Sequence, residues 1–389
     1  MAAGVLGAFA VHSAPPTSAD EATNCDASWV AAWHASPVAD QADSANAELP
    51  ELSGHTARMV VHPEATGTAV RLHFTNRYGT APLQIGRVTI GSRPVTFNGQ
   101  PGVTVQPGGM IFSDAVALRI VANRAMAVSV FLVDAAQPVT RHPDTRTTSS
   151  VFDASGSASP TASAFYFDGL DVRVPVRTNA VIAVGDSITD GYGTKLDARE
   201  PWPDALQRRL DREGASRRMV VLNGGISGNR LLVDDPLHHG ESALSRLGWD
   251  GAANAGVTDV ILSAGTNDIG FGSASRAAAV TTGMTRFAAM AHARGLRVFA
   301  TTITPSAWGV AGAGQLRDSV NDWLRRVGPT VFDGVFDFAA SVADPASHVA
   351  LAAEYDAGDG LHINGAGQAR LARAIDVDSL SGSPCLKAR

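Results

Sequence analysis

Residues that act together in nucleophilic catalysis occur in the second half of this 389-residue chain. Ser187 lies in the sequence Gly-Asp-Ser-Ile-Thr, and Asp359 precedes His362 by three residues near the C-terminus. Residues three apart on a turn lie on one face, so the Asp359 carboxylate can reach the His362 imidazole. A carboxylate in that place holds the base in one tautomer, and the base can then deprotonate a serine hydroxyl. These residue types predict acyl transfer through Ser187.

Two further segments contain groups that can stabilise an oxyanion. Gly228 lies in a run of small residues, which lets a backbone N–H approach a reacting carbonyl closely. Asn267, in the sequence Gly-Thr-Asn-Asp, offers a side-chain amide as a second donor. We therefore expect Gly228 and Asn267 to line the same site as the serine.

Each of these segments also has a structural explanation when it is taken alone. A serine between a buried strand and a helix can cap that helix, which is the stronger interpretation of Ser187 by itself. An ordinary turn explains Gly228, and an Asx-turn or a helix cap explains Asn267. A surface pair on a loop is the alternative for Asp359 and His362. Only the combination of the four segments favours catalysis.

The elements that position these residues follow from hydrophobic patterning in the second half of the chain. Short apolar runs, typical of buried strands, alternate there with segments of helical periodicity. The apolar runs are residues 180–184, 219–222, 260–262, 298–300 and 335–338, and the helical segments are residues 202–213, 275–294 and 315–327. This alternation indicates a parallel sheet covered by helices on both faces, with function at the carboxyl ends of its strands.

The first half of the chain has a β pattern instead. Val70, Leu72 and Phe74 alternate with polar residues, and a later alternation changes phase at Gly86, which suggests a bulge. Short strands, many turn residues and no long helical pattern predict a β-sandwich or jelly roll. We expect a leader or disordered segment at residues 1–24, the β domain at residues 25–172 and the catalytic domain at residues 178–389.

In order and position, the four polar segments resemble blocks I, II, III and V of the SGNH (GDSL-like) hydrolase family, over about half of the chain. The resemblance implies a three-layer α/β/α domain of flavodoxin-like topology, preceded here by the all-β domain. It also implies that Ser187 attacks an ester carbonyl, that His362 takes and returns its proton, and that Asp359 orients His362. The backbone N–H groups of Ser187 and Gly228, with the amide of Asn267, would form the oxyanion hole.

The resemblance implies a serine esterase that hydrolyses short-chain acyl or acetyl esters through an acyl-enzyme on Ser187. A carbohydrate ester is one expected substrate, and no cofactor or metal is expected because the family mechanism needs none. The alternatives are a lipase or arylesterase, an acyltransferase, and a glycan-binding protein with a vestigial hydrolase domain. An α/β-hydrolase is disfavoured, because Thr189 stands where the G-x-S-x-G elbow of those enzymes has its second glycine.

The charge and the apolar runs of the chain limit the partners and the cellular location that we expect. With a net charge of −6 and no basic run, the chain is not expected to bind nucleic acid. No stretch approaches the ~18 uninterrupted apolar residues of a membrane-spanning helix, so no integral membrane segment is expected. A small-molecule or polysaccharide ester is the expected partner, and the oligomeric state is left open. An N-terminal apolar run followed by small residues resembles the end of a signal peptide and predicts secretion by a bacterium.

The two cysteines, Cys25 and Cys385, lie close to opposite ends of the chain. They are too few for a disulfide framework and do not form a CxxC pair. Two arrangements are open: one bridge that ties the ends of the chain together in an oxidising compartment, or two unpaired thiols.

Other residues of types that can bind ligands or metals are weaker candidates for a functional site. The run at residues 234–239 contains aspartates and histidines of the metal-ligand type, but a solvated loop is the preferred explanation. Trp202 and Trp308 lie near strand ends, where they line a pocket or pack in the core. Trp33 and His34 could reach the active site from the β domain, although packing is the preferred explanation for both.

Overall fold

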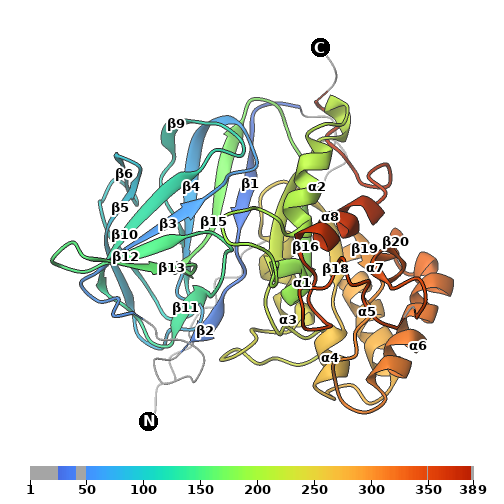
Figure 1. Cartoon of the computed structure of the whole chain (residues 1–389). Helices are drawn as coiled ribbons and strands as arrows, with labels where there is room; N and C mark the ends of the chain where they lie inside the picture. The colour runs from blue at the N-terminus through green and yellow to red at the C-terminus, as the bar shows by residue number, and fades with distance from the viewer. Residues whose placement is uncertain (1–24, 41–49, 348, 387–389) are drawn as a thin grey trace, which may run out of the picture.

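The computed structural model describes residues 25–40, 50–347 and 349–386 of the chain. Figure 1 shows a β-rich part, built from the first half of the chain, beside an α/β part built from the second half. The leader predicted at residues 1–24 lies outside the described residues. The last strand of the β-rich part ends at Val174, and the first strand of the α/β part begins at Ala180. The domain limits that we expect at residues 172 and 178 stay a prediction beside these observed bounds.

Three antiparallel sheets build the β-rich part. The first has the order β1-β15-β4-β8, with β9 also paired to β4, and consists of β1 (Ser28–His34), β15 (Phe167–Val174), β4 (Gly67–Thr75), β8 (Met110–Phe112) and β9 (Val116–Ile120). The second has the order β13-β12-β3-β10-β5-β6, with β7 also paired to β5, and consists of β13 (Ala158–Thr161), β12 (Ser149–Phe152), β3 (Thr56–Val61), β10 (Met126–Asp134), β5 (Leu83–Ile90), β6 (Arg93–Val95) and β7 (Val103–Val105). The third has the order β14-β11-β2, with β14 (Ala164–Phe165), β11 (Val139–His142) and β2 (Val38–Asp40).

Alternating side chains of the two larger sheets form the core of the β-rich part. Val70, Leu72 and Phe74 on β4 are fully buried, as their alternation with polar residues predicts. They belong to the same hydrophobic cluster as buried residues of β5 and β10 in the second sheet. The register between β5 and β10 shifts at Gly86, where a bulge was predicted. The predicted β-sandwich is therefore confirmed.

A five-stranded parallel sheet of order β17-β16-β18-β19-β20 forms the centre of the α/β part. Its strands are β16 (Ala180–Gly185), β17 (Val220–Gly225), β18 (Val257–Ser263), β19 (Arg297–Thr301) and β20 (Gly334–Phe336). The helices are α1 (Ser187–Asp190), α2 (Trp202–Leu210), α3 (Ala243–Leu247), α4 (Thr266–Gly270), α5 (Ala277–His292), α6 (Ala313–Arg326), α7 (Phe338–Val342) and α8 (Gly365–Ala374). This strand order is the 2-1-3-4-5 order of flavodoxin-like folds, so the predicted topology is confirmed.

Helices cover both faces of this sheet, because successive side chains of a strand point to opposite sides. Val181 and Ala183 of β16 pack in a cluster with buried residues of α2, α7 and α8. Ile182 and Val184 pack in a second cluster with buried residues of α3, α5 and α6. The second cluster continues into the core of the β-rich part. The three layers are those predicted, and a shared apolar core fixes the β-rich part against one of them.

One predicted strand ends earlier than its apolar pattern suggests. The run at residues 335–338 predicts a strand through Phe338, but β20 ends at Phe336 and Phe338 begins α7. Asp337 causes this change, because its side chain accepts the Ala340 N–H (3.0 Å) and caps the helix. Phe338 is nevertheless fully buried, which explains why its hydrophobicity resembled that of a strand residue.

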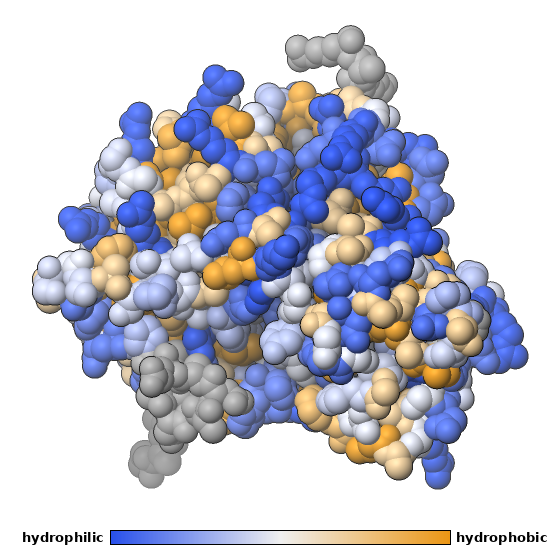
Figure 2. All heavy atoms as spheres, in the orientation of Figure 1, coloured by the Kyte–Doolittle hydropathy of each residue, from blue (hydrophilic) through white to orange (hydrophobic). Residues whose placement is uncertain are grey.

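Hydrophilic side chains cover most of the molecular face in Figure 2, and apolar residues form small separate groups on it. Within the part of the chain that the structure describes, no helix is long and apolar enough to cross a membrane.

A disulfide joins Cys25 to Cys385, with Cα atoms 5.3 Å apart and a sequence separation of 360 residues. Replacing both cysteines with serine is expected to lower the free energy of unfolding by about 2–5 kcal/mol, because the bridge restricts the unfolded chain. Urea denaturation of the oxidised wild type, the reduced wild type and the double variant measures the difference. Equal midpoints for the oxidised and reduced wild type would contradict a stabilising bridge.

Candidate active site

Strand ends of the parallel sheet position the predicted catalytic serine. Ser187 is the first residue of α1 and follows β16 after one residue. That intervening residue, Asp186, caps the helix, since its carboxylate accepts the Ile188 N–H (3.0 Å). Ser187 is therefore not the cap, and its hydroxyl is available for another partner. Because α1 has only four residues, its dipole adds little to the chemistry of Ser187.

The structure brings Ser187, His362 and Asp359 together in one chain of hydrogen bonds. Ser187 Oγ lies 3.0 Å from His362 Nε2, so the hydroxyl can donate to the ring. His362 Nδ1 donates to Asp359 Oδ2 at 2.6 Å. Asp359 Oδ1 accepts the backbone N–H groups of His362 (2.8 Å) and Leu361 (3.0 Å). These bonds orient the imidazole with its unprotonated nitrogen toward the serine.

The hydrogen bonds keep Asp359 ionised. Partial burial raises the pKa of Asp359, but the bonds from the His362 ring and from the backbone N–H groups of His362 and Leu361 outweigh it and lower the pKa to about 2. On the open side, the ring of Tyr192 lies against the His362 ring with centroids 4.3 Å apart. The base is thus held by a carboxylate at one nitrogen and covered by an aromatic ring.

Gly228 and Asn267 lie in the same cavity as Ser187. Gly228 has a φ of +77°, and a Cβ at this position would lie 2.1 Å from the His239 ring, so only glycine fits the turn. Asn267 is 5% exposed and donates one amide hydrogen to the Asn229 carbonyl (3.0 Å). An amide carries two hydrogens, and within the described residues the second one is left to meet a ligand in the cavity.

The loop that contains Gly228 is tied to the helix that contains Asn267. The Asp268 carboxylate accepts the backbone N–H groups of Leu231 (2.7 Å) and Leu232 (2.9 Å). Asp268 is fully buried, and its pKa is raised by burial against the opposing effect of these bonds. The predicted donors therefore sit on segments that hold one another.

Arg246 is a buried residue of the site region that the sequence analysis missed. Its guanidinium donates to the carbonyls of Gly185 (3.0 Å) and Gly224 (2.7 Å), at the carboxyl ends of β16 and β17. It pairs with Asp250, which in turn lies 3.2 Å from the ring of His34 in the β-rich part. The four-residue spacing of Arg246 and Asp250 was the only available sequence signal, since such pairs meet on a helix.

Both parts of the molecule line the candidate active site, which occupies a cavity of about 610 Å³. The lining residues from the β-rich part are Val38, Asp40, Arg141, Pro143 and Asp144. Those from the α/β part are Ser187, Asp190, Tyr192, Ile226, Ser227, Gly228, Leu237, His238, His239, Asn267, Phe271, Trp308, Leu361 and His362. The walls differ in character: the β-rich part contributes charged side chains, whereas Phe271 and Trp308 form an aromatic corner with ring centroids 5.1 Å apart.

Of the weaker candidates named from the sequence, some line this cavity and others pack in the core. Trp308 lines it, whereas Trp202 is fully buried against Phe338 in the core. Trp33 stacks on Phe167 (5.0 Å between centroids) and His34 is buried near Asp250, so neither residue lines the cavity. In the described residues, no group of three or more histidine, cysteine or acidic side chains has the arrangement of a metal site, and this includes the run at residues 234–239.

Comparison with known proteins finds similarities in the second half of the chain. The model of the GDSL-like Lipase/Acylhydrolase family matches residues 183–370. Among solved structures, Est24, a carbohydrate acetylesterase from Sinorhizobium meliloti, is 19% identical, with a TM-score of 0.39 over 52% of this chain and 97% of that chain. The native aryl esterase of M. smegmatis is 17% identical, with a TM-score of 0.39 over 51% of this chain and 96% of that chain. A comparison with curated proteins finds no match.

Proposed function

We propose that the protein is a serine esterase that hydrolyses carboxylic esters through an acyl-enzyme on Ser187, and the match of residues 183–370 to the model of the GDSL-like Lipase/Acylhydrolase family supports this proposal. The observation that carries this proposal is the continuous hydrogen-bond chain from Ser187 through His362 to Asp359, with links of 3.0 and 2.6 Å. This chain also supports an active enzyme over a glycan-binding protein with a vestigial hydrolase domain.

In the proposed reaction, His362 Nε2 takes the Ser187 hydroxyl proton while Oγ forms a bond to the ester carbonyl carbon. The backbone N–H groups of Ser187 and Gly228 and the free amide hydrogen of Asn267 stabilise the negative oxygen. The bond from carbon to the leaving alcohol then breaks, and His362 returns the proton to that alcohol. Water repeats the sequence to release the acid, and the ionised Asp359 stabilises the imidazolium in both halves.

The unequal walls of the cavity suggest the substrate class. We propose that the aromatic corner of Phe271 and Trp308 takes a short acyl group, and that the wall with Asp40, Arg141 and Asp144 takes a hydroxylated alcohol such as a sugar. A second candidate is an aryl or lipid ester, which the exposure of Phe271 (46%) at the edge of the cavity favours. Secretion is proposed as well, supported by the disulfide, since such bonds persist in oxidising compartments.

Hydrolysis of p-nitrophenyl esters from acetyl to palmitoyl, measured beside acetate release from acetylated xylan, tests these proposals. A carbohydrate esterase is expected to prefer the polysaccharide, whereas a preference for long acyl chains would favour a lipase. Acylated product from an added alcohol or sugar would identify an acyltransferase. Labelling with a p-nitrophenyl phosphonate followed by peptide mapping tests the nucleophile, and a label on any residue other than Ser187 would contradict the assignment.

Replacing Asn267 with alanine is expected to lower kcat by about 10²–10³-fold with little change in KM, the usual effect of losing one oxyanion donor. The reason is that charge develops on the carbonyl oxygen only in the transition state. Steady-state kinetics on p-nitrophenyl acetate measures both constants. A rise in KM with an unchanged kcat would show that Asn267 binds the substrate rather than the oxyanion.

A further inference from the structure

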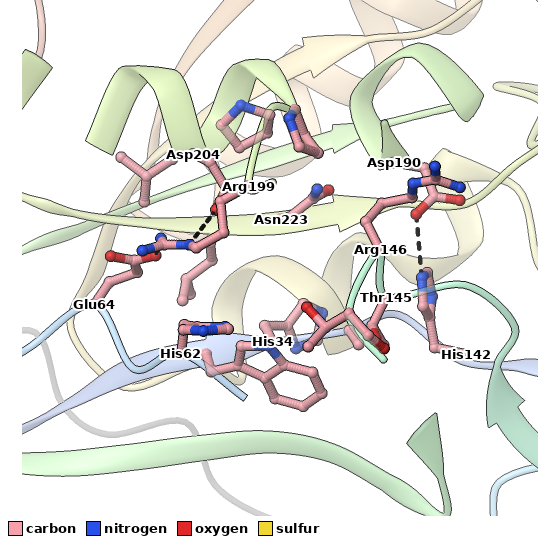
Figure 3. Close-up of a pocket in the computed structure, with 17 residues that line it drawn as sticks. His34, His62, Glu64, His142, Thr145, Arg146, Asp190, Arg199, Asp204 and Asn223 are labelled. Carbon is pink, nitrogen blue, oxygen red and sulfur yellow. Dashed lines mark hydrogen bonds and ion pairs between the residues drawn. The ribbon is translucent and has the colours of Figure 1, made fainter. Parts of the chain in front are cut away.

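His142, from the β-rich part, is buried beside the candidate active site. It is the last residue of β11 and is 4% exposed. Its ring Nε2 lies 3.1 Å from Oδ1 of Asp190, the last residue of α1. Figure 3 shows the ring pointing at this carboxylate across the junction of the two parts, at one end of a polar cavity. Asp190 lines both this cavity and the catalytic one.

Oxygen atoms surround both ring nitrogens of His142. Nδ1 lies 2.8 Å from the Ser36 carbonyl oxygen. Nε2 lies 3.1 Å from the Asp144 carbonyl oxygen and from the Asp190 carboxylate. The two carbonyl oxygens only accept hydrogen bonds, and so does the carboxylate when it is ionised, so a doubly protonated ring satisfies all three partners.

Charged groups around His142 fit this assignment. Burial lowers the pKa of His142, but the Asp190 carboxylate, the Ser36 carbonyl and Asp144 outweigh it and raise the pKa to about 9. Arg146 lines the same cavity, and its guanidinium is paired with Asp144. The other charged or titratable groups near the ring are His34, Asp250 and Arg246 beyond Ser36, and His62, Glu64, Arg199 and Asp204 along the cavity.

Asp190 connects His142 to the loop of the candidate oxyanion hole. Its second oxygen, Oδ2, accepts the Ser227 N–H (3.1 Å) and the Ser227 hydroxyl (2.7 Å). Ser227 begins the peptide whose N–H belongs to Gly228. The turn is closed by a bond from the Asn229 N–H to the Ile226 carbonyl (3.0 Å). Whatever holds Ser227 therefore sets the direction of the Gly228 N–H.

We propose that His142 is a positioning residue for ester hydrolysis: its positive charge holds the Asp190 carboxylate, which holds Ser227 and so aims the Gly228 N–H at the oxyanion. This inference rests on the proposed function, because it assigns Gly228 as an oxyanion donor. It gives the β-rich part a role in turnover besides lining the cavity. When the ring loses its proton, the Asp190 carboxylate loses the positive charge that holds it in place. The turn with Ser227 and Gly228 is then no longer fixed.

The proposal predicts the pH dependence of both activity and stability. A histidine whose folded pKa is raised stabilises the protein fully below its ordinary pKa of 6.5, and this contribution is lost as the pH rises through about 9. The wild-type kcat is expected to fall in the same range, with circular dichroism confirming that the fold persists at each pH. A kcat that stays flat from about pH 8 to 10 would overturn the proposal without any variant.

His142→Gln tests the charge, since glutamine keeps a neutral N–H donor at this position. At pH 7.5 the variant is expected to have a kcat about 10–100-fold lower and a KM within about threefold of wild type, because a misplaced donor affects mainly the transition state. The fall in kcat as the pH rises through about 9, the alkaline limb of the pH profile, should be absent from the variant. A kcat within twofold of wild type, or an unchanged alkaline limb, would overturn the proposal. Ser227→Ala, which removes one of the two bonds to Asp190, should fall between the two proteins.

Nuclear magnetic resonance of the inactive Ser187→Ala protein separates this proposal from the proposed function. With ¹⁵N-histidine labelling, the His142 ring is expected to carry protons on both nitrogens at pH 8, and it is assigned by its absence in His142→Gln or His142→Asn. A neutral ring would overturn the inference and leave the esterase proposal intact. If instead no ester is hydrolysed in a Ser187-dependent way while the ring is doubly protonated, the proposed function fails and the structural assignment of His142 holds.

Discussion

Ser187→Ala is expected to lower kcat for ester hydrolysis by about 10⁴–10⁶-fold, which leaves only the contribution of the oxyanion donors and of substrate binding. The reason is that, among the described residues, Ser187 supplies the hydroxyl that lies 3.0 Å from His362 Nε2. The fold should be unaffected, because the cap of α1 is Asp186 and alanine is a good helix residue at the first position. Kinetics on p-nitrophenyl acetate and a thermal melt measure the two effects.

Ser319→Ala is the matched control for that variant. Ser319 lies on α6, and its hydroxyl bonds only the Gln315 carbonyl of the same helix (2.8 Å) in the described structure. Ser319 is exposed and does not line the catalytic cavity, so kcat should stay within about twofold when its hydroxyl is removed. If Ser187→Ala retained activity within tenfold of wild type, or lost it together with its cooperative melt, the assignment of the nucleophile would fail.

The local parts of the site could be predicted from the sequence because each depends on a few neighbouring residues. Asp359 and His362 meet across one turn, and Ser187 follows directly after a strand of continuous hydrophobicity. Parallel strands end at the same edge of their sheet, so the residues after β16, β17 and β18 had to converge. The alternation of apolar runs and helical segments predicted the parallel sheet and its covering helices, whereas the strand order was implied by the family resemblance.

The contribution of the β-rich part could not be predicted in the same way. Arg141 and His142 lie on a short strand between β14 and β2, in a sheet whose strands come from distant parts of the chain. Nothing in their local sequence indicates that one lines the catalytic cavity and the other bonds Asp190. Such contacts depend on how the two parts of the molecule pack, and hydrophobic periodicity carries no information on that packing.

Helix caps at two strand ends were not predicted from the sequence. A cap at Ser187 was the alternative weighed for that segment alone, and the structure places the cap one residue earlier, at Asp186. The strand predicted through Phe338 was cut short by the cap at Asp337. In both cases an aspartate competes for the backbone N–H groups at a strand end, and apolar patterns do not register this competition.

Asp359→Asn is expected to reduce kcat by up to about 10⁴-fold with little change in KM. The amide oxygen can still accept the backbone N–H groups of His362 and Leu361, so the turn should keep its shape. The amide nitrogen then faces His362 Nδ1, where two donors would meet. The ring escapes this repulsion by moving its proton to Nε2, and in that tautomer it cannot take the proton of Ser187.

Asp356→Asn is the control for this argument, because Asp356 belongs to the same loop and, in the described structure, its carboxylate bonds only backbone N–H groups. Its Oδ1 accepts the N–H groups of Gly358 (2.8 Å) and Gly360 (3.0 Å), which an amide oxygen can also accept. We expect the kcat of Asp356→Asn to stay within a few-fold of wild type.

The low pKa of Asp359, about 2, keeps its carboxylate charged at every pH above about 4. The loss of kcat in Asp359→Asn should therefore be the same at pH 6 and pH 8. If Asp359→Asn and Asp356→Asn lost the same amount of kcat, Asp359 would have only a structural role in the loop, and Ser187 and His362 would act without it.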